Sequence, residues 1–206
     1  MAAEALAREG LTIEPMRGPL GAMIRGIDLD HIGADEGAQL RSALHHHGVL
    51  FYRPGAEAEV TAEQFLRLGE AVGEIFRFPY GDKDPKEDVR IGYIDADADI
   101  QKDRQYCWHS DGTPEECPPG AALLNCVVAP EWGGDTMWAG MGAAYDGLSP
   151  HYQRFLDGLE VLHSTDAMAR KMGPGVGKRI FKDGSHHVHP AVIADPVTWR
   201  RLLYVN

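Results

Sequence analysis

Apolar residues recur at helical spacing in the stretch ADEGAQLRSALHHHG, residues 34–48. Leu40 and Leu44 are four residues apart and therefore share one face of a helix. Gly48 follows the last periodic residue, where a helix often ends in a glycine cap. The pattern predicts a helix that turns its apolar face toward a core and ends in polar histidines.

Two further helices are predicted from their start signals. In TAEQFLRLGEAVGEI, Thr61 and Gln64 have the spacing of a capping box. An apolar stripe follows at Phe65, Leu68 and Val72. In SPHYQRFLDGL, Ser149 has the N-cap position and Pro150 the first helical position.

Short runs of β-forming residues between glycines and prolines predict strands. These runs lie at 11–30, 49–53, 120–130, 131–140 (after a Gly-Gly turn) and 187–206, the last as two strands around a turn. Residues 76–103 are polar and without periodicity, which indicates a long loop. This order favours an α+β protein with a mainly antiparallel sheet or barrel over a βαβ repeat.

Composition narrows the class of protein. The 206 residues fit a single domain, 1–206, and 44% of them are hydrophobic, which is enough for a packed core. A net charge of −11 argues against binding nucleic acid or an anionic membrane, since both require clustered Lys and Arg. The sequence has neither a signal-peptide pattern at its start nor a run of 18 apolar residues. A cytoplasmic protein is therefore expected.

One short motif, His109-Ser110-Asp111, raises the question of a metal site. With 10 His and 17 Asp in 206 residues, about 0.8 H-x-D triplets are expected by chance, so the triplet alone carries little information. At the end of a strand, however, the two side chains would point to one face. With a second histidine from elsewhere they would form the two-His-one-carboxylate triad of non-haem Fe(II) oxygenases.

Two other clusters can be weighed as metal sites. His45, His46 and His47 are consecutive on a predicted helix, so they point about 100° apart and cannot all face one ion. A polar helix end is the better interpretation. The cysteines, which include Cys107 and Cys117 on either side of His109, lack the C-x2-C or C-x4-C spacing of zinc sites and are expected to be reduced thiols.

The surroundings of the triplet carry a family resemblance. WHSD, the apolar run GAALLNCVV, GGDTMW and AAYDGLSP follow one another in order, and HPAVIADPVTWRRLLYVN comes later. The segments IRGIDLD, GVLFYR and GEIFRFPYG belong to the same resemblance. From about residue 11 to 206 the sequence resembles the TauD/TfdA family of Fe(II)- and 2-oxoglutarate-dependent dioxygenases, the taurine and 2,4-dichlorophenoxyacetate dioxygenase type.

The resemblance implies a fold, cofactors and a reaction. The fold would be a double-stranded β-helix, or jelly roll, with flanking helices. His109 and Asp111 match the iron ligands, and Thr136 matches the threonine that contacts the far carboxylate of 2-oxoglutarate. The protein would use Fe(II), 2-oxoglutarate and O2 to hydroxylate a small-molecule substrate of organic-acid type, releasing succinate and CO2. Association into homo-oligomers is compatible with the family.

The family places its second iron histidine and its 2-oxoglutarate arginine beyond the position of Asn206. We therefore expect a C-terminally incomplete chain that lacks the final core strands and, alone, does not turn over 2-oxoglutarate. A histidine within SHHVHP (His186, His187 or His189) is the alternative third ligand. An inactive fragment or a non-catalytic metal-binding jelly roll is the alternative to an enzyme.

Three positions depart from the family pattern. Phe78 stands where taurine-specific relatives have a histidine that meets the sulfonate, and Gln105 stands where they have an asparagine. Both are candidate substrate-binding residues, and Phe78 argues against taurine as the substrate. Trp199 occupies a hairpin-turn position that is commonly glycine, so it would be strained if the turn requires a positive φ.

Overall fold

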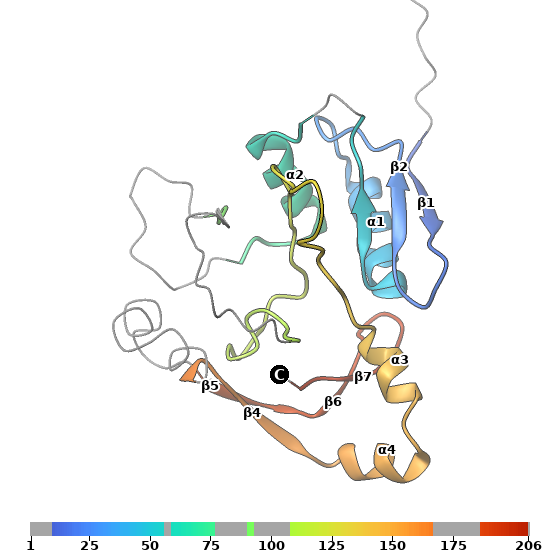
Figure 1. Cartoon of the computed structure of the whole chain (residues 1–206), viewed down its shortest axis with the longest axis vertical. Helices are drawn as coiled ribbons and strands as arrows, with labels where there is room; N and C mark the ends of the chain where they lie inside the picture. Colours follow the sequence, from blue (N-terminus) through green and yellow to red (C-terminus); the bar gives the residue numbers. More distant parts are fainter. Residues whose placement is uncertain (1–9, 56–58, 77–89, 93–107, 167–185, 206) are drawn as a thin grey trace, which may run out of the picture. The chain divides into compact units, whose positions relative to one another are not determined.

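The computed structural model describes residues 10–55, 59–76, 90–92, 108–166 and 186–205. These residues form four helices and seven strands, in keeping with the predicted α+β class (Figure 1). The chain divides into two compact units, each built from several stretches of sequence. Unit 1 comprises Met1–Glu74, Leu124–Asp146 and Ala194–Arg200, and unit 2 comprises Ile75–Leu123, Gly147–Ile193 and Arg201–Asn206.

Unit 1 contains a three-stranded sheet. Strand β1 (Thr12–Pro15) is antiparallel to β2 (Ala22–Arg25), and β2 is parallel to β3 (Leu50–Tyr52). The parallel pair is connected through α1 (Ala34–His47), so one βαβ crossover is present although the sequence favoured antiparallel pairing. A parallel pair needs such a long connection, and a helix supplies it.

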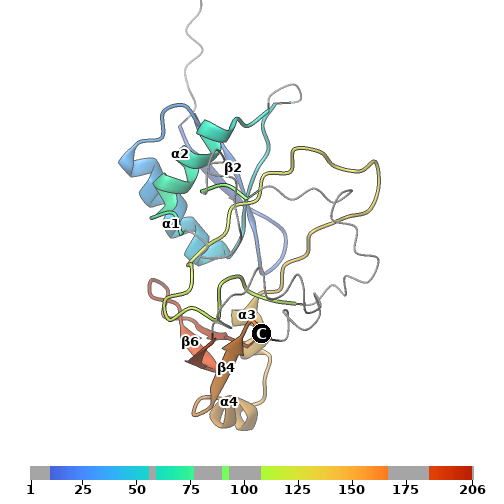
Figure 2. The same cartoon turned by 90° about the vertical axis from the view of Figure 1, so that its left-hand side faces the viewer.

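The core of unit 1 lies between this sheet and α1. Ala22 and Ile24 alternate along β2 and are buried, and Leu40 and Ala43 are buried on α1. The predicted apolar face of α1 is thus correct at Leu40. Helix α2 (Ala62–Val72) packs beside α1, as Figure 2 shows.

The helix caps follow the prediction. At α1, the N–H of Gly48 donates to the carbonyl of Leu44, and Gly48 has a φ of 72°. At α2, the backbone N–H of Gln64 donates to the Thr61 hydroxyl at 3.2 Å, and the Thr61 N–H donates to the Gln64 side chain at 3.1 Å. This reciprocal pair satisfies two N–H groups that the helix itself leaves without partners.

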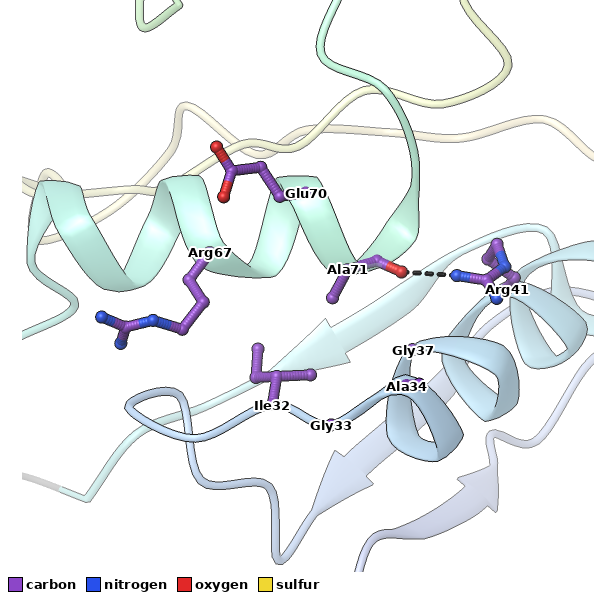
Figure 3. Close-up of a pocket in the computed structure, with 8 residues that line it drawn as sticks. All are labelled: Ile32, Gly33, Ala34, Gly37, Arg41, Arg67, Glu70 and Ala71. Atoms are coloured by element: carbon purple, nitrogen blue, oxygen red, sulfur yellow. Dashed lines mark hydrogen bonds between the residues drawn. The ribbon is translucent and has the colours of Figure 1, made fainter.

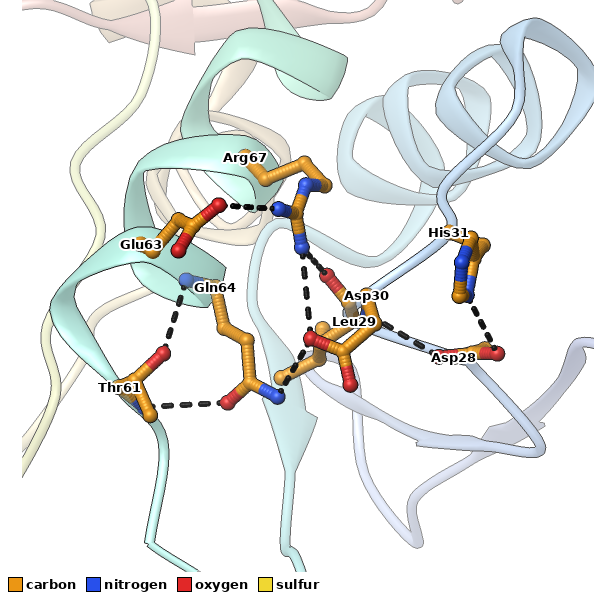
Figure 4. Close-up of polar contacts among 8 residues, drawn as sticks. All are labelled: Asp28, Leu29, Asp30, His31, Thr61, Glu63, Gln64 and Arg67. Atoms are coloured by element: carbon orange, nitrogen blue, oxygen red, sulfur yellow. Dashed lines mark hydrogen bonds and ion pairs between the residues drawn. The ribbon is translucent and has the colours of Figure 1, made fainter.

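Hydrogen bonds connect α2 to the loop before α1 (Figure 4). Arg67 donates to the carbonyl of Leu29 at 2.9 Å and pairs with Glu63 at 2.8 Å, while Gln64 donates to Asp30 at 3.0 Å. The residues that begin α2 therefore also fix its position against the 28–31 loop.

Unit 2 contains the antiparallel pair of β4 (Glu160–Ser164) and β5 (His186–Pro190), preceded by helix α4 (Pro150–Leu156). As predicted, Ser149 caps α4 and accepts a bond from the N–H of Tyr152.

Strands β6 (Val192–Ala194) and β7 (Arg201–Leu203) pair as a hairpin, which confirms the strand–turn–strand prediction for the end of the chain. Helix α3 (Met141–Asp146) belongs to unit 1.

The strands predicted at 120–130 and after the 133–134 turn are wrong. Neither stretch is assigned to a strand, and Val127 and Val128 are 71% and 86% exposed. An apolar run becomes a strand only when a neighbour satisfies its backbone, and the described residues provide no such neighbour. The turn itself is confirmed, since Gly133 and Gly134 have φ of 77° and 73°. None of the helices in the described residues meets the length and apolarity needed to cross a membrane.

Candidate metal centre

The His109–Asp111 pair lies in unit 2, at the start of a tight turn. Nε2 of His109 is 3.5 Å from Oδ1 of Asp111, and the two side chains are 54% and 56% exposed. A strand end was the condition under which the two side chains would share one face; here residues 108–110 have no regular structure and residues 111–114 form a turn. The imidazole and the carboxylate approach to 3.5 Å without strand alternation at these positions.

A glycine makes this turn possible. Gly112 has a φ of 67°, a conformation that L side chains rarely adopt, and a Cβ atom there would overlap the ring of Pro119. The turn closes with a hydrogen bond from the N–H of Glu115 to the carbonyl of Gly112 at 3.0 Å. Thr113, between them, is only 1% exposed. The backbone that follows Asp111 is therefore fixed by sterics and burial.

The donor atoms of the pair suit a divalent ion. Imidazole nitrogen and carboxylate oxygen bind first-row metals at roughly 2.1 Å, so two ligands on adjacent positions of one ion lie about 3 Å apart. The observed separation of 3.5 Å is close to this value. Both groups are also accessible from solvent. The pair fits two of the three protein ligands of the expected iron site.

The third ligand is not found in the described part of the chain, which contains no group of three His, Cys, Asp or Glu that could hold a metal. His189, an alternative candidate, directs Nε2 at two backbone carbonyls instead. Cys117 and Cys126 are exposed and free, while Cys107 lies outside the described residues.

The three histidines at the end of α1 form a polar helix end, as predicted. His45 contacts Asp195 at 2.7 Å, and the His46 ring contacts the carbonyl of Ser42 at 2.7 Å. Their partners differ, so they do not converge on one point.

The predicted roles of Thr136, Phe78 and Gln105 in binding 2-oxoglutarate and the substrate remain predictions. Thr136 follows the Gly133–Gly134 turn in unit 1, whereas His109 and Asp111 belong to unit 2. Phe78 and Gln105 lie outside the described residues.

The structure adds a buried histidine cluster that the sequence did not predict. His163 on β4 is 3% exposed, and its ring stacks on Tyr204 at 5.1 Å and meets His189 edge-on at 5.3 Å. Burial lowers the pKa of His163 below its ordinary value of 6.5, the neighbouring His189 lowers it further, and the nearby backbone of Tyr204 opposes both. Neither ring nitrogen is in hydrogen-bond geometry with any described residue. One feature of the sequence could have indicated the cluster: His187 and His189 in HHVHP are two residues apart, so on a strand they point to the same face.

Unit 1 contains a separate hollow of about 370 Å³ between α1 and α2 (Figure 3). Its lining residues are Ile32, Gly33, Ala34, Gly37, Arg41, Arg67, Glu70 and Ala71. Arg41 donates to the carbonyl of Ala71 at 2.6 Å, and Arg67 is bonded to Leu29 and Glu63. Both guanidinium groups are thus engaged by protein oxygens.

Comparison with known proteins identifies one family for nearly the whole sequence. The sequence profile described as "Taurine catabolism dioxygenase TauD, TfdA family" matches residues 12–206. An alpha-ketoglutarate-dependent sulfate ester dioxygenase of Pseudomonas putida is 30% identical over 95% of this chain and 66% of its own length. An alpha-ketoglutarate-dependent sulfonate dioxygenase of Saccharomyces cerevisiae is 28% identical over 95% of this chain and 49% of its own. Alpha-ketoglutarate is the same compound as 2-oxoglutarate.

A solved structure supports the same family assignment. The crystal structure of a taurine dioxygenase from Burkholderia xenovorans superposes with a TM-score of 0.62 at 26% identity, covering 94% of this chain and 62% of that one. The chain spans about half to two thirds of the length of these relatives. A match across nearly the whole sequence shows that the chain belongs to the TauD/TfdA family of dioxygenases.

Proposed function

We propose that the protein is an Fe(II)- and 2-oxoglutarate-dependent dioxygenase that hydroxylates a small organic acid and releases succinate and CO2. The observation that carries this proposal is the 3.5 Å separation of His109 Nε2 and Asp111 Oδ1, in a chain that belongs to the family. A neutral imidazole and a carboxylate are the ligand types that suit Fe(II) in such enzymes.

Each residue has a proposed part. His109 and Asp111 would hold the iron together with a third protein ligand that the described residues do not supply, and the open positions would take 2-oxoglutarate and O2. The hydroxyl of Thr136 donates to the far carboxylate of 2-oxoglutarate, since a carboxylate accepts strong hydrogen bonds. Bound iron with 2-oxoglutarate supplies the oxidising chemistry, and the protein orients the substrate and excludes water. We also propose that the strands around this site belong to the jelly-roll fold of the family.

The proposed substrate is an organic anion with an apolar part. The relatives named above act, by their names, on sulfate esters and sulfonates. Phe78 has no group that could donate a hydrogen bond to a sulfonate, in contrast to the histidine of taurine-specific relatives. We therefore propose alkyl sulfonates, alkyl sulfate esters or carboxylates larger than taurine, with Phe78 and Gln105 in contact with the substrate.

The test is succinate formation. The 206-residue chain and the product of its complete reading frame are each supplied with Fe(II), 2-oxoglutarate, O2 and a panel of these anions. Succinate from either protein that is abolished by His109→Ala and by Asp111→Ala supports the proposal. Glu116→Ala, which removes an exposed carboxylate from the same segment, is the matched control. Turnover that survives Asp111→Ala would contradict the proposal.

The alternative function is metal binding without turnover. It is favoured by one observation, that the described residues bring together only two metal-ligand side chains at the site. Divalent-metal binding that depends on His109, with no succinate formed by the complete reading frame, would favour this alternative.

A further inference from the structure

A histidine distant in sequence contacts the turn that carries the candidate ligand pair. Nε2 of His189, on β5, lies 3.0 Å from the carbonyl oxygen of Thr113 and 3.0 Å from that of Glu115. These contacts join positions 76 and 74 residues apart in the sequence. All three residues belong to unit 2.

The partners determine the protonation of the ring. Carbonyl oxygens only accept hydrogen bonds, so Nε2 must carry the hydrogen, which it shares between the two oxygens. His189 therefore acts as a donor that holds the two carbonyls together. The turn between them cannot open without lengthening at least one of these bonds.

Neighbouring rings fix the direction of this donor. The His189 ring packs edge-on against Tyr204 at 5.5 Å and against His163 at 5.3 Å, and it contacts His187 at 4.7 Å. His163 is buried, and the backbone of Tyr204 is anchored by a bond from its N–H to the carbonyl of Ala191. Rings on several sides leave the imidazole little freedom to rotate away from the turn.

The two carbonyls lie close to the ligands along the chain. Thr113 is two residues after Asp111, and the Glu115 N–H closes the same turn onto Gly112. The Thr113 carbonyl belongs to the peptide plane between residues 113 and 114, and its bond to His189 restrains the ψ of Thr113. Together with the Glu115–Gly112 bond, the clamp restrains the backbone directly after Asp111.

We infer that His189 is a positioning residue, which clamps the turn from Gly112 to Glu115 and thereby orients His109 and Asp111 toward one metal ion. Its effect on metal binding rests on the proposed function, whereas the clamp itself does not. His189 is not a ligand in this assignment, because it acts through the backbone of Thr113 and Glu115.

The experiment uses three variants of the chain and Co(II) as the probe. His189→Phe keeps a ring but removes the donor, His189→Gln offers an N–H near the position of Nε2, and Val188→Ala is the control on the same strand. Val188 is 47% exposed and, as the neighbour of His189 on β5, lies on the opposite face of the strand. Loss of an outer contact of this kind weakens metal affinity about 10- to 100-fold.

We expect His189→Phe to weaken Co(II) binding in calorimetry by about tenfold or more, His189→Gln to restore most of the affinity, and Val188→Ala to leave it unchanged. Co(II) affinity that is equal in His189→Phe and the unsubstituted chain, with both folded by circular dichroism, would overturn the positioning role.

A second measurement, without metal, separates this inference from the proposed function. Nuclear magnetic resonance of the metal-free chain should show the Nε2–H form of His189 and a protected Glu115 amide. That amide should exchange about five times faster or more in His189→Phe, since a hydrogen bond is lost. An Nδ1–H form, or unchanged exchange, would overturn the clamp. Absence of Co(II) binding by the unsubstituted chain, with the clamp present, would count against the proposed function alone.

Discussion

Nδ1 of His45 lies 2.7 Å from Oδ2 of Asp195, which joins the last turn of α1 to the hairpin turn at 195–200. The other oxygen of Asp195 accepts from the backbone N–H groups of Val197 at 2.9 Å and Thr198 at 2.7 Å. One carboxylate therefore organises the turn and attaches it to a helix 150 residues earlier.

This carboxylate should make the stability of the protein sensitive to acid. Burial raises the pKa of Asp195, but bonds from the Thr198 backbone, His45, the Thr198 hydroxyl and the Val197 backbone outweigh it and lower the pKa to about 2. A lowered pKa contributes stability that is present above the ordinary value of 3.8 and is lost as the pH falls toward 2. Urea unfolding at pH values from 5 to 2 measures this loss.

Two substitutions isolate the role of Asp195. Asp195→Asn keeps an oxygen acceptor but does not titrate, so its free energy of unfolding should fall less steeply than that of the unsubstituted chain in this pH range. Asp195→Ala also removes the acceptor and should cost about 1–3 kcal/mol at pH 7. An Asp195→Asn variant with the original pH slope would contradict the assignment.

Trp199 should be replaceable with a gain in stability. It has a φ of 57° and is 78% exposed, so the expected strain at this turn position is confirmed while little packing depends on the ring. A left-handed conformation costs an ordinary residue about 1–2 kcal/mol and glycine almost nothing. Trp199→Gly should raise the free energy of unfolding by about 1 kcal/mol in urea titrations. Trp199→Ala, which keeps the backbone strain, should show no comparable gain.

His163 should weaken the fold as the pH falls below neutrality. Its pKa is lowered in the folded chain, mainly by burial, so the unfolded chain takes up the proton first near pH 6.5. The contribution of His163 to stability is therefore complete above pH 6.5 and decreases below it. His163→Phe keeps the stacking on Tyr204 and should flatten the dependence between pH 7 and 5, as measured by thermal unfolding. It should also be at least as stable at pH 7, because the substitution removes two buried nitrogens that have no hydrogen-bond partner among the described residues.

Gly112 should be intolerant of any side chain. Gly112→Ala would force a Cβ atom into Pro119 and a left-handed conformation onto alanine, and should cost more than about 1 kcal/mol of stability. Gly120 is the matched control, since a Cβ atom there meets nothing within 4 Å. Equal melting temperatures for Gly112→Ala and Gly120→Ala would show that the turn does not depend on this glycine.

The parts of the fold that were predictable depend on local interactions. The caps at Thr61 and Gly48 involve residues three or four apart, so the sequence contains the whole interaction. That residues 120–130 form no strand could not be predicted in this way, because strand pairing depends on a partner elsewhere in the chain. The His109–Asp111 pair was found as a motif, but its geometry depends on a turn that His189 holds from more than 70 residues away.

The division of the chain into two units constrains the order in which it can fold during synthesis. The chain passes from one unit to the other five times, after Glu74, Leu123, Asp146, Ile193 and Arg200. Neither unit is a continuous segment, so no single cut yields either one. The ribosome must deliver residues 194–200 before His45 can meet Asp195, although α1 emerges first. Helix α1 therefore waits for a partner that is made 150 residues later, and pauses in translation before that point would prolong the time for which the helix is exposed to chaperones and proteases.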